Sequence, residues 1–383
     1  MKISEDVKYI GVNDTTIDLF ENQYPVPKGV SYNSYLILDE SVALLDTVDA
    51  VKQSEWEKNL LTALEGRSVN YLVIHHLEPD HAGSIGRLME LFPDMTLVGN
   101  AKTFQMLPQF FELPSERKTL TVKEGDTLCL GKHTLTFLMA PMVHWPEVMV
   151  SYEEQDKILF SADAFGTFGV PEGEPEADWA EEAARYYFNI VGKYGAMVQT
   201  LLKKVSGLTI QTICPLHGPV LKDNLAPYLH LYQIWSSYQP EKEGVLVAYA
   251  SIHGNTEKAA KKAAELLEKQ GVSTRICDLS RTDVSVAVAL AFRYDKMLLA
   301  ASSYNAEVFP CMQNFLLHLK HNGYQNRRVG MIENGSWAPS AGRVMKSLLE
   351  TMKNIEVVEP LVTIKSTMKK ENEEPLAQLV EAL

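Results

Sequence analysis

The sequence predicts a mixed α/β and α+β protein of two domains, an N-terminal αββα sandwich followed by a C-terminal doubly wound parallel sheet. Three observations support this prediction. The chain has 383 residues, more than the ~100–200 residues of a typical domain. Short strands that end in polar loops dominate residues 1–240, whereas strands and amphipathic helices alternate in residues 241–383. Residues 1–240 carry 18 Lys and Arg against 32 Asp and Glu, and residues 241–383 carry 18 against 17.

The composition excludes several classes of protein. Apolar residues make up 46% of the chain, which is enough for two cores, and no apolar run is long enough to cross a membrane. The first residues are acidic and lack the apolar stretch of a secretory signal. A net charge of −13 disfavours nucleic acid as a partner. The four cysteines are far apart in the sequence, which argues against a disulfide framework and for a reduced, cytoplasmic protein.

In the N-terminal half, predicted strands are short and several run straight into polar loops. A tight turn joins strands at residues 31–39 and 41–47. Further apolar strands at 69–76, 134–141 and 157–163 each end in polar residues. Mixed strands and helices with polar residues at the strand exits favour a layered αββα domain.

The C-terminal half follows a polar segment, residues 235–244, which contains Pro240 and marks the predicted boundary. An apolar strand at 244–250 precedes an amphipathic helix at 256–271 that ends in Gly271. Strands at 273–279, 295–303 and 327–336 follow, separated by helical stretches. This alternation predicts a parallel, doubly wound sheet.

Four potential metal ligands follow the apolar strand 71–74 within six residues, and three more stand at later strand exits. They are His76, Glu78, Asp80, His81, His144, Asp163 and His217. Any one of them alone is most simply a capping or hydrogen-bonded loop residue. Because sheets of this class build their sites at strand exits, the set as a whole predicts one shared site.

Four imidazoles and three carboxylates suit two metal ions with one carboxylate bridging them. Two divalent cations are balanced by three carboxylates and one hydroxide, so that the site is neutral and can be buried. Zinc accepts such nitrogen and oxygen ligands, and iron or manganese do so as well. The residues therefore predict a binuclear metal site and leave the metal open.

Three polar loops of the C-terminal half predict a flavin site. The first loop joins a strand to a helix, and its small and hydroxyl residues suit a terminal phosphate such as that of FMN; it contains Ser251, His253, Gly254, Asn255 and Thr256. The GxGxxG pattern of dinucleotide sites is absent. Two later loops carry Ser303, Tyr304 and Asn305, and Asn334, Gly335, Ser336 and Trp337. Taken alone, the first loop is most simply an ordinary helix N-cap. The rings of Tyr304 and Trp337 could pack on the isoalloxazine, with plain core packing as the alternative.

The first motif, HxExDH, is similar to the HxHxDH of zinc hydrolases in the metallo-β-lactamase superfamily, with Glu78 in place of the second histidine. With the later His, Asp and His, the pattern resembles the flavodiiron proteins (A-type flavoproteins) over essentially the whole chain. The resemblance implies a metallo-β-lactamase-like diiron domain at residues 1–240 and a flavodoxin-like FMN-binding domain at 241–383. It also implies one iron held by His76, Glu78 and His144, a second held by Asp80, His81 and His217, and a bridging Asp163.

The resemblance implies an oxidoreductase that reduces O₂ to water, NO to N₂O, or both, at two irons supplied with electrons by FMN, for detoxification. Tyr24 is a candidate proton donor, with a buried structural role as the alternative. The expected electron donor is a separate molecule, a rubredoxin-like protein or a reduced deazaflavin. The expected assembly is a head-to-tail homodimer or a dimer of dimers, in which Trp145 contacts the flavin of the partner chain. The alternative function is that of a zinc hydrolase of the metallo-β-lactamase type fused to a flavodoxin redox module.

Overall fold

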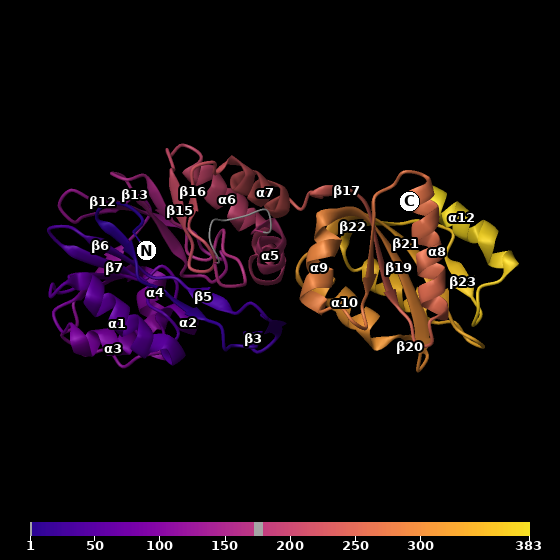
Figure 1. Ribbon diagram of the computed structural model, residues 1–383, viewed down its shortest axis with the longest axis horizontal. Helices are drawn as coiled ribbons and strands as arrows, with labels where there is room; N and C mark the ends of the chain where they lie inside the picture. The colour runs from indigo at the N-terminus through magenta and orange to yellow at the C-terminus, as the bar shows by residue number, and fades with distance from the viewer. Residues whose placement is uncertain (1, 172–178) are drawn as a thin grey trace. The chain divides into compact units, whose positions relative to one another are not determined.

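The computed structural model describes residues 2–171 and 179–383, which form two compact units (Figure 1). The first unit comprises Met1–Tyr187 and Ala196–Gln233, and the second comprises Phe188–Gly195 and Ile234–Leu383. The second unit therefore includes a short segment from the N-terminal half of the chain. The sequence-based division after residue 240 into two functional domains stays a prediction.

Two mixed sheets build the first unit. One sheet has the order β1 (Val7–Tyr9), β6 (Tyr35–Leu38), β7 (Val42–Leu45), β8 (Tyr71–Val73), β9 (Thr96–Asn100) and β10 (Thr119–Val122). The other has the order β11 (Thr127–Cys129), β12 (Thr134–Met139), β13 (Met149–Glu153), β14 (Ile158–Phe160), β15 (Thr212–Cys214) and β16 (Leu221–Lys222). The expected hairpin is present, because β6 and β7 pair antiparallel across a short turn.

The apolar faces of these two sheets pack on each other and form the core of the first unit. In β12, Leu135 and Phe137 are buried in this core, whereas Thr134 and Thr136 are partly exposed. This alternation follows from the two-residue period of a strand, in which one face meets the core and the other meets solvent or a covering layer.

Helices and two small two-stranded sheets complete the first unit. The helices are α1 (Gln53–Leu64), α2 (Pro79–Ala82), α3 (Ile85–Leu91), α4 (Ala101–Met106), α5 (Trp179–Tyr186), α6 (Gly195–Val205) and α7 (Ala226–Ser236). Short strands pair as β2 (Val12–Asp14) with β5 (Val30–Tyr32), and β3 (Leu19–Phe20) with β4 (Tyr24–Pro25). In Figure 1, α1 and α3 lie with the first sheet and α6 and α7 with the second, which gives the expected αββα layers.

The second unit contains a parallel sheet with the order β18 (Thr274–Asp278), β17 (Lys242–Ala250), β19 (Tyr294–Tyr304), β21 (Gln325–Asn334) and β22 (Lys353–Val357). Strand β23 (Val362–Ile364) extends the pairing along β21, and the short β20 (Glu307–Val308) pairs antiparallel with β19. If these five strands are numbered in the order in which they occur in the chain, their order in the sheet is 2-1-3-4-5. This is one of the two common doubly wound topologies. The predicted fold class is confirmed.

Helices cover both faces of this parallel sheet. They are α8 (Asn255–Lys269), α9 (Val284–Arg293), α10 (Pro310–His321), α11 (Ala341–Leu349) and α12 (Glu373–Ala382). The helices α8 and α12 share one core with the sheet, to which α8 contributes Ala259, Ala260, Ala263, Ala264 and Leu267. Their spacing places these side chains on one helical face. No helix of the described residues is long and apolar enough to cross a membrane.

Candidate metal centre and cofactor cavity

The seven candidate metal ligands all lie at loops or a short helix that follow strands of the sandwich. His76 and Glu78 follow β8, Asp80 and His81 lie in α2, His144 lies between β12 and β13, Asp163 follows β14 and His217 follows β15. Pro79 occupies the first turn of α2, where its missing N–H costs nothing. The sandwich thus brings together residues that are up to 141 positions apart.

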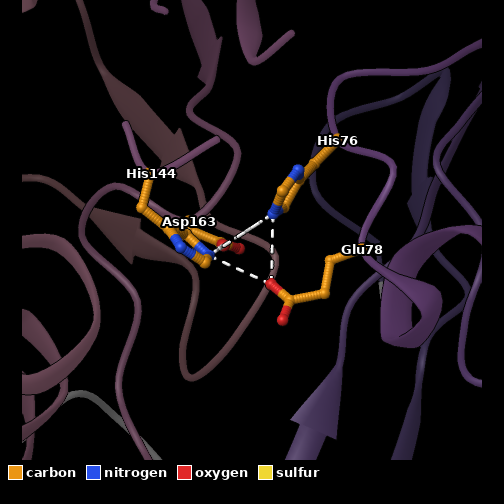
Figure 2. A group of neighbouring side chains, drawn as sticks. All are labelled: His76, Glu78, His144 and Asp163. Atoms are coloured by element: carbon orange, nitrogen blue, oxygen red, sulfur yellow. Dashed lines mark hydrogen bonds and ion pairs between the residues drawn. The ribbon is translucent and has the colours of Figure 1, made fainter. Parts of the chain in front are cut away.

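Four of the ligands form a first group, shown in Figure 2. The carboxylate oxygen Oε2 of Glu78 lies 3.2 Å from Nε2 of His76 and 3.0 Å from Nε2 of His144. Oδ2 of Asp163 lies 3.4 Å from Nε2 of His76 and 3.0 Å from Nε2 of His144. The ligand atoms all lie within 4.8 Å of one another, a spacing that suits one metal ion.

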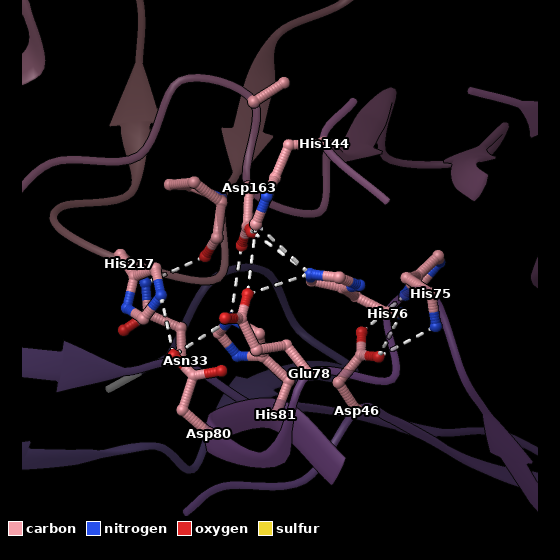
Figure 3. A network of polar contacts seen from close by, with 12 residues as sticks. Asn33, Asp46, His75, His76, Glu78, Asp80, His81, His144, Asp163 and His217 are labelled. Carbon is pink, nitrogen blue, oxygen red and sulfur yellow. Dashed lines mark hydrogen bonds and ion pairs between the residues drawn. The ribbon is translucent and has the colours of Figure 1, made fainter. Parts of the chain in front are cut away.

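Asp80, His81 and His217 form a second group. Nε2 of His217 lies 3.1 Å from Oδ2 of Asp80, and Nε2 of His81 lies 3.1 Å from Oδ1 of Asp163. Asp163 therefore presents one oxygen to each group, and Figure 3 shows it between His76 and His217. This is the arrangement expected of a carboxylate that bridges two metals.

Several buried polar atoms of these groups have no hydrogen-bond partner among the described residues. They are both oxygens of Asp80, both oxygens of Asp163, both ring nitrogens of His81 and Nε2 of His217. Buried polar atoms in folded proteins are nearly always satisfied. Lone pairs that converge without hydrogen bonds are satisfied by metal ions, so the residues fit a binuclear centre.

The charges of the site also suit cations. Burial raises the pKa of Asp163, but the charges of the neighbouring His81 and His76 outweigh burial and hold this pKa well below its usual value. Burial opposes a charge on His144, yet its close contacts with the carboxylates of Asp163 and Glu78 raise the pKa of His144 to about 9. Ionised carboxylates in a buried site are balanced either by protons on the histidines or by metal ions, and the two compete.

His75, next to the ligand His76, is not a free proton source. Its Nδ1 lies 2.6 Å from Oδ2 of Asp46 and its Nε2 lies 2.8 Å from Oγ of Ser151. Oδ1 of Asp46 also accepts hydrogen bonds from the backbone N–H groups of His75 and His76. His75 and Asp46 belong to loops after the first sheet and Ser151 to the second, so this contact fixes the ligand loop between the sheets.

Tyr186, at the end of α5, is a residue of the site that the sequence did not single out. Its hydroxyl is buried without a hydrogen-bond partner among the described residues, and its ring lies 5.6 Å from the ring of His217. Burial and then the charges of Asp163, Glu78 and Asp80 raise the pKa of Tyr186 well above its usual value. A Cβ at Gly166 would lie 3.3 Å from this ring, so the Asp163 loop passes close to the tyrosine. No sequence signal separates it from a core tyrosine.

The two aromatic residues expected near the metal, Tyr24 and Trp145, have different surroundings. Tyr24 is buried in β4, with its ring 5.9 Å from that of Phe168, which packs on Tyr186. Trp145 lies edge-on to His76 at 5.2 Å and stacks on Phe110, whose side chain is exposed. The roles expected for Tyr24 and Trp145 stay predictions.

A cavity of about 480 Å³ in the second unit is formed by the three polar loops together with one more segment. Its lining includes Ser251, His253, Asn255, Thr256, Ser303, Tyr304, Asn305, Asn334, Gly335, Ser336 and Trp337. Gly254 lies behind this lining, and its φ of +83° turns the chain into α8. The cavity lies at the N-terminus of a helix, where backbone N–H groups favour a phosphate.

The details of this cavity refine the expected flavin contacts. Trp337 is 92% exposed and Tyr304 is 46% exposed, so both rings are free to cover an aromatic ligand. Oγ of Ser303 accepts hydrogen bonds from the N–H groups of Ser340 and Ala341, so it also caps α11. Ser366, which carries no sequence signal of its own, lines the cavity and accepts a hydrogen bond from Asn334. Ser366 lies 30 residues after Ser336, and the hydroxyl groups of the two serines are hydrogen-bonded to each other.

Comparisons with known proteins agree with the folds of the two units. A family model described as ODP family beta lactamase matches residues 30–218, and a flavodoxin model matches residues 247–377. The anaerobic nitric oxide reductase flavorubredoxin of Pectobacterium atrosepticum is 30% identical over 361 residues, which cover 91% of this chain and 70% of that protein. The rubredoxin oxygen:oxidoreductase of Desulfovibrio gigas has a similar structure, with a TM-score of 0.92 and 25% identity over 100% of this chain and 97% of that one. The flavodiiron protein of Giardia intestinalis shares the fold, with a TM-score of 0.91 and 23% identity over 100% and 95% of the chains.

Proposed function

The chain belongs to the flavodiiron protein family, and from this premise we propose that it reduces O₂ to water, NO to N₂O, or both, as an FMN- and diiron-dependent oxidoreductase. The main support for the proposal is the position of Asp163. Its two buried oxygens lack hydrogen bonds among the described residues and face two separate groups of ligands. The flavodoxin match and the cavity at the start of α8 support FMN as the source of electrons.

When bound, FMN supplies two electrons and the pair of irons together supplies two more. Four electrons and four protons convert O₂ to two waters. Two electrons and two protons convert two NO to N₂O and water. We propose that His76, Glu78 and His144 hold one iron, that Asp80, His81 and His217 hold the other, and that Asp163 bridges them. The spacing within each group and the unpartnered atoms support this assignment.

The side chains around the ligands exclude water and place a proton near the site. The rings of Phe20, Tyr32 and Tyr186 lie 5.3–6.1 Å from the ring of His217 and form an apolar wall. The Oη–H of Tyr186 is a fully buried donor in this wall and has no partner among the described residues. We propose that it donates a hydrogen bond to the bound gas and, with Tyr24 behind Phe168, assists proton delivery.

We further propose a separate rubredoxin-like electron donor, with a reduced deazaflavin as the alternative, and a head-to-tail dimer or a dimer of such dimers. A relative named flavorubredoxin and a structural neighbour named rubredoxin oxygen:oxidoreductase support the donor class. Two-fold symmetry would place Trp145 of one chain against the flavin of the other and create two equivalent active sites. The four free cysteines support a reducing, cytoplasmic location.

Metal and flavin analysis followed by rapid kinetics tests the proposal. Purified protein should hold two irons and one FMN per chain, and its fully reduced form should be oxidised rapidly by O₂, by NO, or by both in stopped-flow experiments. The relative rates of the two gases give the preferred substrate. Two zinc ions per chain with no oxidation by either gas would instead support a hydrolase fused to a flavodoxin module.

A further inference from the structure

Glu147 lies directly behind the ligand His76 and is completely buried. Its Oε1 is 2.8 Å from Nδ1 of His76 and accepts a hydrogen bond from the backbone N–H of Leu77 at 2.9 Å. Its other oxygen, Oε2, has no hydrogen-bond partner among the described residues. A buried carboxylate that is only half satisfied is expensive to keep in a fold, which indicates that its charge is used.

The backbone of Glu147 is held from a second direction. The side-chain amide of Asn100 donates a hydrogen bond to the carbonyl oxygen of Glu147 at 2.6 Å. The oxygen of the same amide caps α4 by accepting hydrogen bonds from the N–H groups of Lys102 and Thr103. Asn100 therefore ties the backbone of Glu147 to the start of α4.

The two groups of ligands differ in what supports their histidines. Nδ1 of His217, in the second group, lies 2.8 Å from the neutral carbonyl oxygen of Ser31. Nδ1 of His76, in the first group, meets the carboxylate of Glu147 instead. Hydrogen bonds of this kind fix the tautomer of a metal-binding histidine, and a carboxylate also makes the ring a stronger ligand.

We propose that Glu147 is a positioning residue that holds the proton of His76 on Nδ1, directs Nε2 at the first group and makes that group the stronger of two unequal metal sites. This proposal shares one assumption with the proposed function, namely that the two groups of ligands bind metal ions. The negative charge of Glu147 adds to those of the ligands Glu78 and Asp163 on one side of the centre, whereas the carboxylate ligands of the second group are Asp80 and the shared Asp163.

Two substitutions separate the geometry from the charge. Glu147→Gln keeps an oxygen that accepts from His76 and Leu77 but removes the charge. Glu147→Ala removes both. Zinc alone is the probe, bound to metal-free protein that retains FMN and titrated against a coloured chelator. Loss of such a supporting carboxylate typically weakens metal binding about 10–100-fold. We expect the tighter of the two zinc ions to be bound about tenfold more weakly in Glu147→Gln and about a hundredfold more weakly in Glu147→Ala.

The tautomer of His76 is a second measurement, and it would not change if Glu147 had only a structural role. In the zinc-loaded protein with nitrogen-labelled histidine, the His76 signal should show a protonated Nδ1 in wild type and in Glu147→Gln, and should lose this signature in Glu147→Ala. The matched control is Glu333→Gln, because Glu333 is also buried and accepts hydrogen bonds, from the N–H of Gly342 and the hydroxyl of Thr363, but lies in the second unit. Its zinc affinities should equal those of wild type.

Unchanged zinc affinities in both Glu147 variants would overturn the proposal, as would an equal loss in the Glu333→Gln control. Circular dichroism and retained FMN confirm that each variant is folded, and Glu147→Gln is the variant on which the decision rests if Glu147→Ala does not fold. Zinc binding needs no redox chemistry, so wild-type protein that binds two zinc ions unequally but does not reduce either gas would refute the proposed function and leave this inference standing.

Discussion

At the scale of a single residue, the hydroxyl of Tyr186 allows a role in gas reduction to be separated from a role in packing. It is buried without a hydrogen-bond partner among the described residues and lies close to the charges of the metal ligands. Removing an unsatisfied buried hydroxyl costs little stability and can increase it. For Tyr186→Phe we therefore expect an unchanged or higher melting temperature together with slower gas reduction, by about a hundredfold if the hydroxyl delivers a proton.

A second tyrosine in the chain provides the control for this experiment. Tyr324 also has a buried hydroxyl without a partner among the described residues, but it lies in the second unit, before β21. Tyr324→Phe should affect stability in the same direction and leave the rates with O₂ and NO unchanged. Equal rates for wild type and Tyr186→Phe would show that Tyr186 only packs against His217.

Asp163 is the residue whose loss should most reduce metal binding, because its oxygens lie within 3.4 Å of three histidines from the two groups. Asp163→Asn keeps the shape but removes one negative charge and weakens the bridge. We expect less than half of the wild-type iron content by metal analysis, with FMN content unchanged because the flavin cavity is in the other unit. Full iron content would mean that Asp163 supports the ligands without bridging them.

Residues with a distinctive pattern were predictable from the sequence, whereas residues that act through tertiary packing were not. His76, Glu78, Asp80 and His81 crowd together after one apolar strand, and ordinary loop capping does not need four metal-binding side chains in so short a stretch. Glu147 and Tyr186 are different, because a glutamate next to a proline and a tyrosine in an amphipathic helix are ordinary features. Only the fold places the first behind His76 and the second beside His217.

At the scale of elements, His133 connects the two sheets of the sandwich. The side chain precedes β12 and is buried, with Nδ1 2.9 Å from Oε1 of Glu153 in β13 and Nε2 3.1 Å from Oδ2 of Asp6, just before β1. Burial lowers the pKa of His133, but the hydrogen bonds to Asp6 and Glu153 outweigh burial and raise it overall. When protonated, the histidine donates from both ring nitrogens and links the segment before the first strand to the second sheet.

This raised pKa predicts how stability depends on pH. The folded chain holds the His133 proton more tightly than the unfolded chain, so the contact stabilises fully below the unfolded pKa of about 6.5 and is lost as pH rises through the folded pKa. We expect His133→Gln to lower the urea midpoint of the first unit more at about pH 6 than at about pH 9. His230→Gln, at an exposed site in α7, is the control. A loss for His133→Gln that is equal at both pH values would contradict a charged contact.

The segment after α5 shows why one element escaped prediction. A π-helical turn, Tyr187–Val191, follows α5 directly. Within it, Phe188 stacks on Phe292 of α9 at 4.5 Å and Asn189 donates a hydrogen bond to the carbonyl oxygen of Ser285 at 3.1 Å. The pattern of this segment is that of a continuous amphipathic helix, and nothing local indicates that Phe188–Gly195 belongs to the second unit.

At the scale of the whole molecule, the fold class followed from the sequence because strand exits and helix alternation are repeated signals. Each unit uses the same rule, in which polar residues after buried strands meet at one edge of a sheet. In the first unit these residues converge on Asp163, and in the second they line the cavity at the start of α8. How electrons pass from the flavin cavity to the metal centre depends on assembly, which neither unit determines by itself.

A mixing experiment tests the proposed head-to-tail dimer. One variant loses the metal centre through replacement of His76 and Asp163, and the other loses the flavin site through replacement of Asn255 and Thr256. If each flavin serves the metal centre of the partner chain, a heterodimer of the two variants contains one flavin facing one intact centre, whereas each variant alone is inactive. Heterodimers isolated with two different affinity tags should therefore show about half the activity of a wild-type dimer. Under electron transfer within one chain, every chain in the heterodimer lacks one cofactor, and purified heterodimers that remain inactive would rule out the exchange between partners.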